Sequence, residues 1–281
     1  MKKISIVTDS TSDISPSLAR ELGITIVPAI VRFGDRVFHD GVDLTPDEFY
    51  HLLKTSEVHP HTSQPSPGDF AQVFCELGQK SEGVVCATIS SKLSGIYNAA
   101  VLGRDMAGIP CPVEIVDSKF NSAGLGLIAI AAARVANSGG TLKEVMSEVE
   151  SAIGQVKMLG IFDTLEYMVR GGRVSRVKGV AAKLLGVKPM LTFNNGEVVQ
   201  SGLVRTYNLG IKRLADFIGQ QKGLVDVAIS HSQIPDKVND FQVRIAKIWN
   251  KNKVMVFELG PALGVHGGPG VLLVAVRIQE G

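Results

Sequence analysis

An α/β fold with two domains is predicted, the first built on a parallel sheet and the second an α+β arrangement. Through about residue 155, short apolar runs alternate with segments of helical periodicity, which is typical of a parallel sheet covered by helices. Beyond that point, an Asn195–Gly196 pair between two apolar runs indicates a β-hairpin and therefore antiparallel strands. The 281 residues suffice for one large or two ordinary hydrophobic cores. We therefore expect domains at residues 1–155 and 156–281.

In the first domain, helices are expected where a capping residue precedes a helical repeat. Ser15 stands before Pro16, and Thr45 stands before Pro46 with Glu48 at the third helical position. The expected helices are 16–23, 46–54, 67–78, 94–106, 122–139 and 141–153. The expected strands are 4–7, 24–33, 83–89 and 113–117, and residues 59–66 are expected to form a loop.

The second domain is expected to mix strands and helices around the hairpin at residues 187–206. The other expected strands are 157–162, 225–232, 254–259 and 270–278, and the expected helices are 164–172, 207–221 and 236–249. Residues 260–270 read as a glycine-rich connection between the last two strands. No linker rich in proline, glycine or serine separates the domains, so we expect them to pack closely.

Composition excludes several classes of protein. The net charge is +2 with no long basic block, which argues against a nucleic acid partner. The longest apolar stretch, 124–133, is about half the length of a membrane span, so no stable membrane insertion is expected. The start of the chain lacks the apolar length of a signal peptide. Three cysteines without Cys-x-x-Cys spacing are typical of a reducing compartment, so a cytoplasmic location is expected.

The first candidate site is SSKLSGIYNAA, residues 90–100, where an expected apolar strand ends and a helix begins. Ser94 and Gly95 lie at this point, next to the backbone N–H groups of the helix start, which suit an anion. Ser94 could instead be a capping serine and nothing more. A nucleophilic role is the least favoured, because the flanking residues lack the Gly-x-Ser-x-Gly pattern.

Two further segments could hold an anion. HTSQPSPGD places the adjacent hydroxyls of Thr62 and Ser63 in a proline-rich stretch, which could equally be an ordinary loop. GPALGVHGGPG surrounds His266 with five glycines, which allow the backbone to approach a ligand. TDSTSD, residues 8–13, ends the first strand at the edge where ligands bind in α/β sheets, or forms an Asx turn.

No cofactor or metal is expected. GLGLIA, residues 124–129, resembles a dinucleotide motif, but SKFNS intervenes after the preceding strand, where a tight turn is needed. His59 and His61 have no further ligand at metal-binding spacing, and no phosphate-binding loop motif occurs. RGGRVSRVK, residues 170–178, is a basic run that forms either a solvated face or a dock for an acidic partner or phosphorylated ligand.

Seven segments spread from residue 8 to residue 270 together resemble the DegV family of fatty-acid-binding proteins. This family supplies the binding subunit of bacterial fatty acid kinase. The matching segments are TDSTSD, VPAIVRFGDRVFHDGVDLTPDEFY, TSQPSPGDF, SSKLSGIYNAA, IVDSKFNSAGLG, TLEYMVRGGRVS and GVHGGPG. The resemblance covers nearly the whole chain.

The resemblance implies a single long-chain fatty acid in an apolar tunnel, with its carboxylate at the mouth. Residues implied to hold the carboxylate are Thr62, Ser63, Ser94, Gly95, Arg205 and His266. A kinase subunit is implied to phosphorylate the bound carboxylate to an acyl-phosphate, with Arg170 and Arg173 facing that partner. The chain itself is then a non-catalytic binding subunit, and we expect a monomer.

One departure from the family and one alternative function remain. Relatives often carry threonines beside the terminal histidine, whereas Val265 and Gly267 flank His266 here. The alternative function is an acyl hydrolase or acyltransferase that uses Ser94 as nucleophile with His266 as base.

Overall fold

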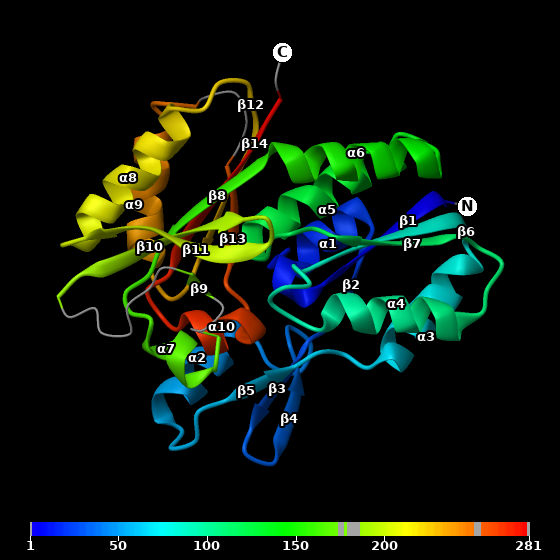
Figure 1. Cartoon of the computed structure of the whole chain (residues 1–281), viewed down its shortest axis with the longest axis horizontal. Helices are drawn as coiled ribbons and strands as arrows, with labels where there is room; N and C mark the ends of the chain where they lie inside the picture. The colour runs from blue at the N-terminus through cyan, green and yellow to red at the C-terminus, as the bar shows by residue number, and fades with distance from the viewer. Residues whose placement is uncertain (1, 174–176, 179–185, 250–253, 280–281) are drawn as a thin grey trace.

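Three sheets organise this computed structural model, which describes residues 2–173, 177–178, 186–249 and 254–279. A four-stranded parallel sheet and a seven-stranded mixed sheet lie beside each other, and a small three-stranded sheet lies beneath them in Figure 1. The expected fold class is confirmed, since the parallel sheet belongs to the N-terminal half and the large sheet of the C-terminal half contains antiparallel pairs.

The parallel sheet has the order β2-β1-β6-β7, and each strand is parallel to its neighbour. Its strands are β1 (Lys2–Asp9), β2 (Ile24–Val27), β6 (Ser81–Thr88) and β7 (Val113–Asp117). Strand β6 is buried at seven of its eight positions, as expected for a parallel strand covered on both faces. The helices of this half are α1 (Pro16–Leu22), α3 (Pro67–Gly78), α4 (Ile96–Ala107), α5 (Ser122–Asn137) and α6 (Leu142–Gln155). Figure 1 shows α3 and α4 on one side of the sheet and α5 and α6 on the other.

Helix α5 is buried along nearly its whole length because it packs between the parallel sheet and the mixed sheet. Its alanines and glycines allow close approach: a Cβ at Gly126 would lie 2.9 Å from the Ser12 carbonyl oxygen and 3.0 Å from the Phe257 ring. One apolar core therefore runs from β1 to β14 (Leu272–Ile278) across both halves of the chain. The division into domains 1–155 and 156–281 stays a prediction.

The mixed sheet has the order β13-β12-β14-β8-β10-β11-β9. Its remaining strands are β8 (Val156–Ile161), β9 (Val177–Lys178), β10 (Lys188–Asn194), β11 (Glu197–Val204), β12 (Leu224–His231) and β13 (Met255–Glu258). The predicted hairpin joins β10 to β11, and both turn residues, Asn195 and Gly196, have positive φ angles of 47° and 82°. Helices α8 (Tyr207–Gly219) and α9 (Pro235–Ile245) pack on this sheet over a second apolar core.

The small sheet corrects two sequence-based expectations. The single strand expected at 24–33 is two strands, β2 and β3 (Ile30–Phe33), because the chain leaves the parallel sheet at Pro28. The loop expected at 59–66 contains β5 (His61–Ser63), which pairs with β3; β4 (Arg36–His39) completes the sheet, and α2 (Pro46–Thr55) follows it. Strand β5 thereby places Thr62 at a fixed position.

Three short helices complete the fold: η1 (Ser10–Ser12), α7 (Glu166–Arg170) and α10 (Pro261–Gly267). Helix α10 corrects the expectation that residues 260–270 form an irregular connection. Gly260 is its N-cap and Pro261 its first helical residue, a favoured pair at a helix start. Helix α10 contacts α2, α7, β3, β5 and η1, so it lies where the two halves meet. Within the described residues, the structure contains no helix with the length and apolarity of a membrane span.

Candidate functional site

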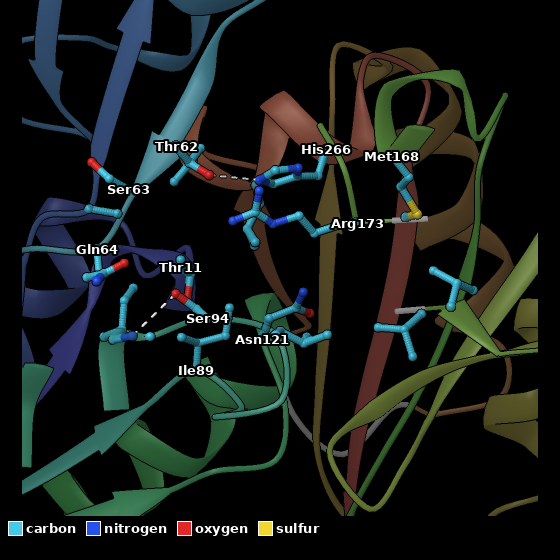
Figure 2. Close-up of a pocket in the computed structure, with 18 residues that line it drawn as sticks. Thr11, Thr62, Ser63, Gln64, Ile89, Ser94, Asn121, Met168, Arg173 and His266 are labelled. Atoms are coloured by element: carbon cyan, nitrogen blue, oxygen red, sulfur yellow. Dashed lines mark hydrogen bonds between the residues drawn. The ribbon is translucent and has the colours of Figure 1, made fainter. Parts of the chain in front are cut away.

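A cavity of about 230 Å³ lies between the end of β6, the small sheet and α10. Figure 2 shows side chains from widely separated segments around it, with Thr62 and His266 on one side and Ser94 and Ile89 on another. The cavity brings together most of the residues that the sequence singled out. Predicted site residues that line it are Thr62, Ser63, Ser94, Gly95, Arg173 and His266.

Thr62 and His266 form a pair across the cavity wall. The Thr62 Oγ1 and His266 Nε2 atoms are 2.9 Å apart, and both residues are half-buried. Gly171 at the end of α7 fixes the other side of the imidazole, because a Cβ there would lie 2.3 Å from His266 Nδ1. The histidine is therefore held between β5 and α7, with its ring in the cavity.

Ser94 and Gly95 lie where α4 begins. Gly95 is the N-cap and supplies no side chain to the helix, while the Ser94 Oγ accepts a hydrogen bond of 3.3 Å from the Ile96 N–H. A hydroxyl that accepts one bond still has its own hydrogen to donate. Ser94 thus presents a donor to the cavity beside the positive end of a helix, an arrangement that favours an anion.

Arg173 lines the cavity, although the sequence-based interpretation placed it on a partner-facing surface. The reason is the turn at the end of α7: Gly172 has a φ of 68°, and the Arg173 N–H bonds the Met168 carbonyl at 2.9 Å. This bond across six residues is a Schellman turn, which directs the chain back over the helix. Figure 2 shows the guanidinium between the Thr62–His266 pair and Ser94. The structure thus puts a cation at the polar end of the cavity.

The other two predicted arginines lie outside this cavity. Arg170 is exposed and forms an ion pair with Glu166 one turn earlier on α7. Arg205 is exposed just beyond β11 and is not part of the cavity wall. The hairpin turn at Gly196 contacts Ser90 near the cavity, and the eight residues of β11 carry the chain roughly 25 Å away from that turn. Arg205 is thus not among the described residues that line the cavity, and its expected role at the carboxylate stays a prediction. Residues 174–176 of the basic segment lie outside the described residues.

A second cavity of about 70 Å³ adjoins the first and is lined almost entirely by apolar side chains. The two cavities share Asn121, Met168, Val198, Leu263 and His266. The apolar wall of the second is completed by Met158, Phe162, Leu191, Phe193, Leu259 and Val271, with Leu273. The combined space is polar and cationic at one end and apolar at the other, which suits a molecule with an anionic head and an alkyl tail.

The TDSTSD segment contributes only Thr11 to the cavity, and its aspartates anchor the surrounding elements. Asp13 accepts hydrogen bonds from the Gly260 N–H at 2.9 Å, from Ser230 at 3.1 Å and from Ser122. It therefore ties η1 to α5, to β12 and to the start of α10. Burial raises the pKa of Asp13 to about 7.

Asp40 anchors the same end of α10. It accepts a hydrogen bond of 2.8 Å from Ser10 and another from the Ala262 N–H, and burial raises its pKa to about 6. Burial also raises the pKa of Asp9, which accepts hydrogen bonds from Thr11 and from the Ile89 N–H. These carboxyl groups connect the parallel sheet to the helix that carries His266.

Sequence comparison places the protein in a family, since a sequence profile of the DegV family matches residues 3–279. The chain belongs to the DegV family. It is 33% identical over 272 residues to a DegV domain-containing protein of Caldanaerobacter subterraneus subsp. tengcongensis, and the match covers 96% of each chain.

Solved structures of DegV proteins share the whole fold. A fatty-acid-binding DegV family protein from Thermus thermophilus matches with a TM-score of 0.89 and 29% identity, covering 99% of this chain and 100% of that one. DegV from Bacillus subtilis, described as a fatty acid binding protein, matches with a TM-score of 0.91 and 26% identity at the same coverage. The structural similarity therefore extends across both halves of this chain.

Three further polar residues of the cavity wall, Thr11, Gln64 and Asn121, were not singled out from the sequence, although Thr11 and Gln64 lie in the candidate segments TDSTSD and HTSQPSPGD. A signal existed for each. Thr11 and Asn121 follow the carboxyl ends of β1 and β7, where ligands of parallel sheets bind, and Gln64 directly follows the paired hydroxyls of Thr62 and Ser63.

Proposed function

We propose that this protein binds one long-chain fatty acid and presents its carboxylate to a fatty acid kinase subunit for conversion to an acyl-phosphate. The observation that carries the proposal is the pair of adjoining cavities, with Thr62, Ser94, Arg173 and His266 at the polar end and an apolar wall beyond. Fatty acid binding by related DegV proteins of the same fold supports it.

The polar end has the chemistry that a buried carboxylate requires. An anion moved out of water is destabilised unless it is paired and hydrogen-bonded. Hydroxyls of Thr62 and Ser94 donate to carboxylate oxygens, and the Arg173 guanidinium supplies the opposite charge together with further donors. With its proton on Nε2, His266 donates to Thr62 Oγ1, which leaves the threonine hydroxyl hydrogen available for the carboxylate.

The apolar end supplies most of the affinity. Each buried methylene contributes about 0.8 kcal/mol, so a chain of fourteen to eighteen carbons gains on the order of 10 kcal/mol before the entropy of association is subtracted. The head group then fixes the orientation of the ligand, with the carboxylate toward the cavity of about 230 Å³.

The kinase step belongs to the partner in this proposal. A carboxylate oxygen attacks the terminal phosphorus of ATP, an acyl–phosphate bond forms, and ADP leaves. The exposed Arg170 lies three residues before Arg173 of the cavity wall, so a partner that reaches the carboxylate would meet it. Arg170 is therefore our candidate for partner contact.

The alternative, a serine hydrolase, is opposed by the geometry. Within the described residues, the Ser94 hydroxyl bonds the Ile96 N–H, while His266 Nε2 bonds Thr62. A serine nucleophile needs its base within hydrogen-bond reach. Covalent labelling of Ser94 by a fluorophosphonate would favour the hydrolase and contradict the carrier.

Native mass spectrometry of the purified protein tests the proposal directly. A mass excess of one C14 to C18 fatty acid, released on denaturation, is the expected result. Delipidated protein should regain one equivalent from solution and should consume ATP only when a fatty acid kinase subunit is present. Failure to bind any fatty acid would contradict the proposal, as would ATP consumption by the chain alone.

A further inference from the structure

Asn121 places an amide at the junction of the two cavities. It belongs to the walls of both, and it shares that position with the apolar side chains of Met168, Val198 and Leu263. Apart from His266, Asn121 is the polar side chain in the wall of the second cavity. Figure 2 shows the amide directed up into the space below Arg173, on the opposite side from Thr62.

The backbone around Asn121 is held rigidly. Its carbonyl oxygen accepts hydrogen bonds from Gly124 and Leu125 at 3.1 and 3.2 Å. Ser122, the next residue, has a φ of 47° and donates its hydroxyl to Asp13. On the other side, Phe120 packs its ring 5.3 Å from that of Phe193. The backbone that carries the amide is therefore fixed in place before any ligand arrives.

The side chain does not perform the local role that its position suggests. Asn121 is the N-cap of α5, where asparagine normally accepts a hydrogen bond from the first turn, yet its side chain does not cap the helix. Within the part of the chain that the structure describes, the amide has no hydrogen bond to another residue. Two N–H donors and one carbonyl acceptor thus face the ligand space.

A plain alkyl chain beside Asn121 would exclude water from this amide without replacing the lost hydrogen bonds. Such an unsatisfied polar group is unfavourable enough to weaken binding about tenfold. A ligand that carries an oxygen atom at this depth would instead accept from or donate to the amide. The cavities therefore favour a ligand whose alkyl chain carries an oxygen atom over one whose alkyl chain carries none.

We propose that the preferred ligand is a fatty acid whose chain bears a hydroxyl or keto oxygen, recognised by Asn121. This inference rests on the proposed fatty acid site and specifies its substrate class. The carboxylate is held by the polar residues of the first cavity, and the chain oxygen meets the amide where the second cavity begins.

Competition binding to delipidated protein tests this inference with chains of equal length. The ligands are stearate and its 3-, 10- and 12-hydroxy derivatives, because the position of the oxygen along the chain is to be read from the result. We expect one isomer to bind about tenfold more tightly than stearate. Asn121→Leu should remove that preference. It should lower the affinity for the hydroxy acid and leave the affinity for stearate unchanged or higher.

Met168→Leu is the matched control, because Met168 lines the same junction without a hydrogen-bonding group. It should leave the ratio of the two affinities unchanged. The inference is overturned if stearate binds at least as tightly as every hydroxy acid in the unaltered protein. It is also overturned if Asn121→Leu weakens stearate and hydroxy acids equally, since the amide would then serve the carboxylate. Absence of binding for every acid would overturn the proposed function itself.

Discussion

At the scale of single residues, the polar end of the cavity depends on how His266 is held. The imidazole has Thr62 on one side at 2.9 Å and the backbone of Gly171 on the other. Neither contact is visible in the sequence, because the three residues are separated by about a hundred positions or more. The position of the His266 ring therefore depends on how α10 packs against α7 and β5.

Gly171→Ala is expected to lower fatty acid affinity by about tenfold or more. The new Cβ would lie 2.3 Å from His266 Nδ1, so the ring or the end of α7 must move. Titration of delipidated protein with a fluorescent fatty acid measures the effect. Gly154→Ala is the control, because its Cβ would meet no atom within 4 Å on helix α6, and it should leave affinity unchanged.

Arg173→Ala is expected to weaken binding of a fatty acid more strongly than binding of the matching fatty alcohol, which lacks the charge. The guanidinium belongs to the cavity wall, so its removal leaves the carboxylate without an opposite charge. Arg205→Ala makes the same change at an exposed position outside the cavity and should bind both ligands normally. If Arg173→Ala and Arg205→Ala bound the fatty acid equally well, the carboxylate would have to lie away from Arg173.

At the scale of helices and strands, the sequence predicted most elements and missed a few short ones, among them β5 and α10. Helix α2 begins at the predicted Thr45–Glu48 capping box, and the hairpin turns at Asn195–Gly196 as expected, because these signals act locally. Strand β5 has three residues and exists only through pairing with β3. The seven residues of α10 are rich in glycine, which hides a helix from any propensity argument.

The candidate site followed the same division. Hydroxyls at Thr62 and Ser94 and the imidazole of His266 stood out by residue type and local sequence, and the structure brings all three to one cavity. Arg173 lies in the cavity wall because a Schellman turn redirects the chain after α7, whereas Arg205 follows β11 outside that wall. The direction in which a turn or strand carries a side chain leaves no periodic pattern in the sequence, so it could not be predicted.

Anchoring of α10 is expected to depend on pH through Asp13 and Asp40. Burial raises their pKa values to about 7 and about 6, above the value of 3.8 for an unfolded chain. The native state therefore binds these protons more tightly, so the stability they contribute is complete below about pH 4 and is lost as pH rises through 7. Each group changes the free energy of unfolding by up to about 1.4 kcal/mol per pH unit.

Urea denaturation between pH 4.5 and 8 measures this dependence. Asp13→Asn removes the titrating proton while keeping an acceptor for the Gly260 N–H, so the decline in stability with pH should be shallower than in the unaltered protein. Asp163→Asn changes an exposed carboxylate and is the control. Identical pH profiles for the unaltered protein and Asp13→Asn would contradict this account.

At the scale of the whole molecule, helix α5 joins the two sheets into one core. Gly126 lies where the backbone of η1 and the ring of Phe257 meet the helix, so the parallel and mixed sheets share this contact. Arg134 adds an ion pair from α5 to Asp226 on β12, in which one guanidinium nitrogen lies 2.8 and 2.9 Å from the two carboxylate oxygens. The two halves are thus expected to unfold together.

Gly126→Val is expected to lower the free energy of unfolding by about 1–3 kcal/mol, since its Cβ would lie 2.9 Å from the Ser12 carbonyl oxygen. Because that contact joins both halves, the melting transition should shift as a single step when followed by circular dichroism and by the fluorescence of Trp249, which lies in the mixed-sheet half. Two separate transitions would instead show that the halves fold independently.

The cavity wall itself is assembled from both halves of the chain, with Thr62 and Ser94 on one side and Arg173 and His266 on the other. An occupant therefore acts as a non-covalent crosslink, and by mass action a ligand at a hundred times its dissociation constant adds about 2.7 kcal/mol to folding stability. Proteases cleave the opened chain, so resistance to degradation should rise and fall with the supply of free fatty acid. The abundance of this protein in a cell would then follow the supply of its proposed ligand.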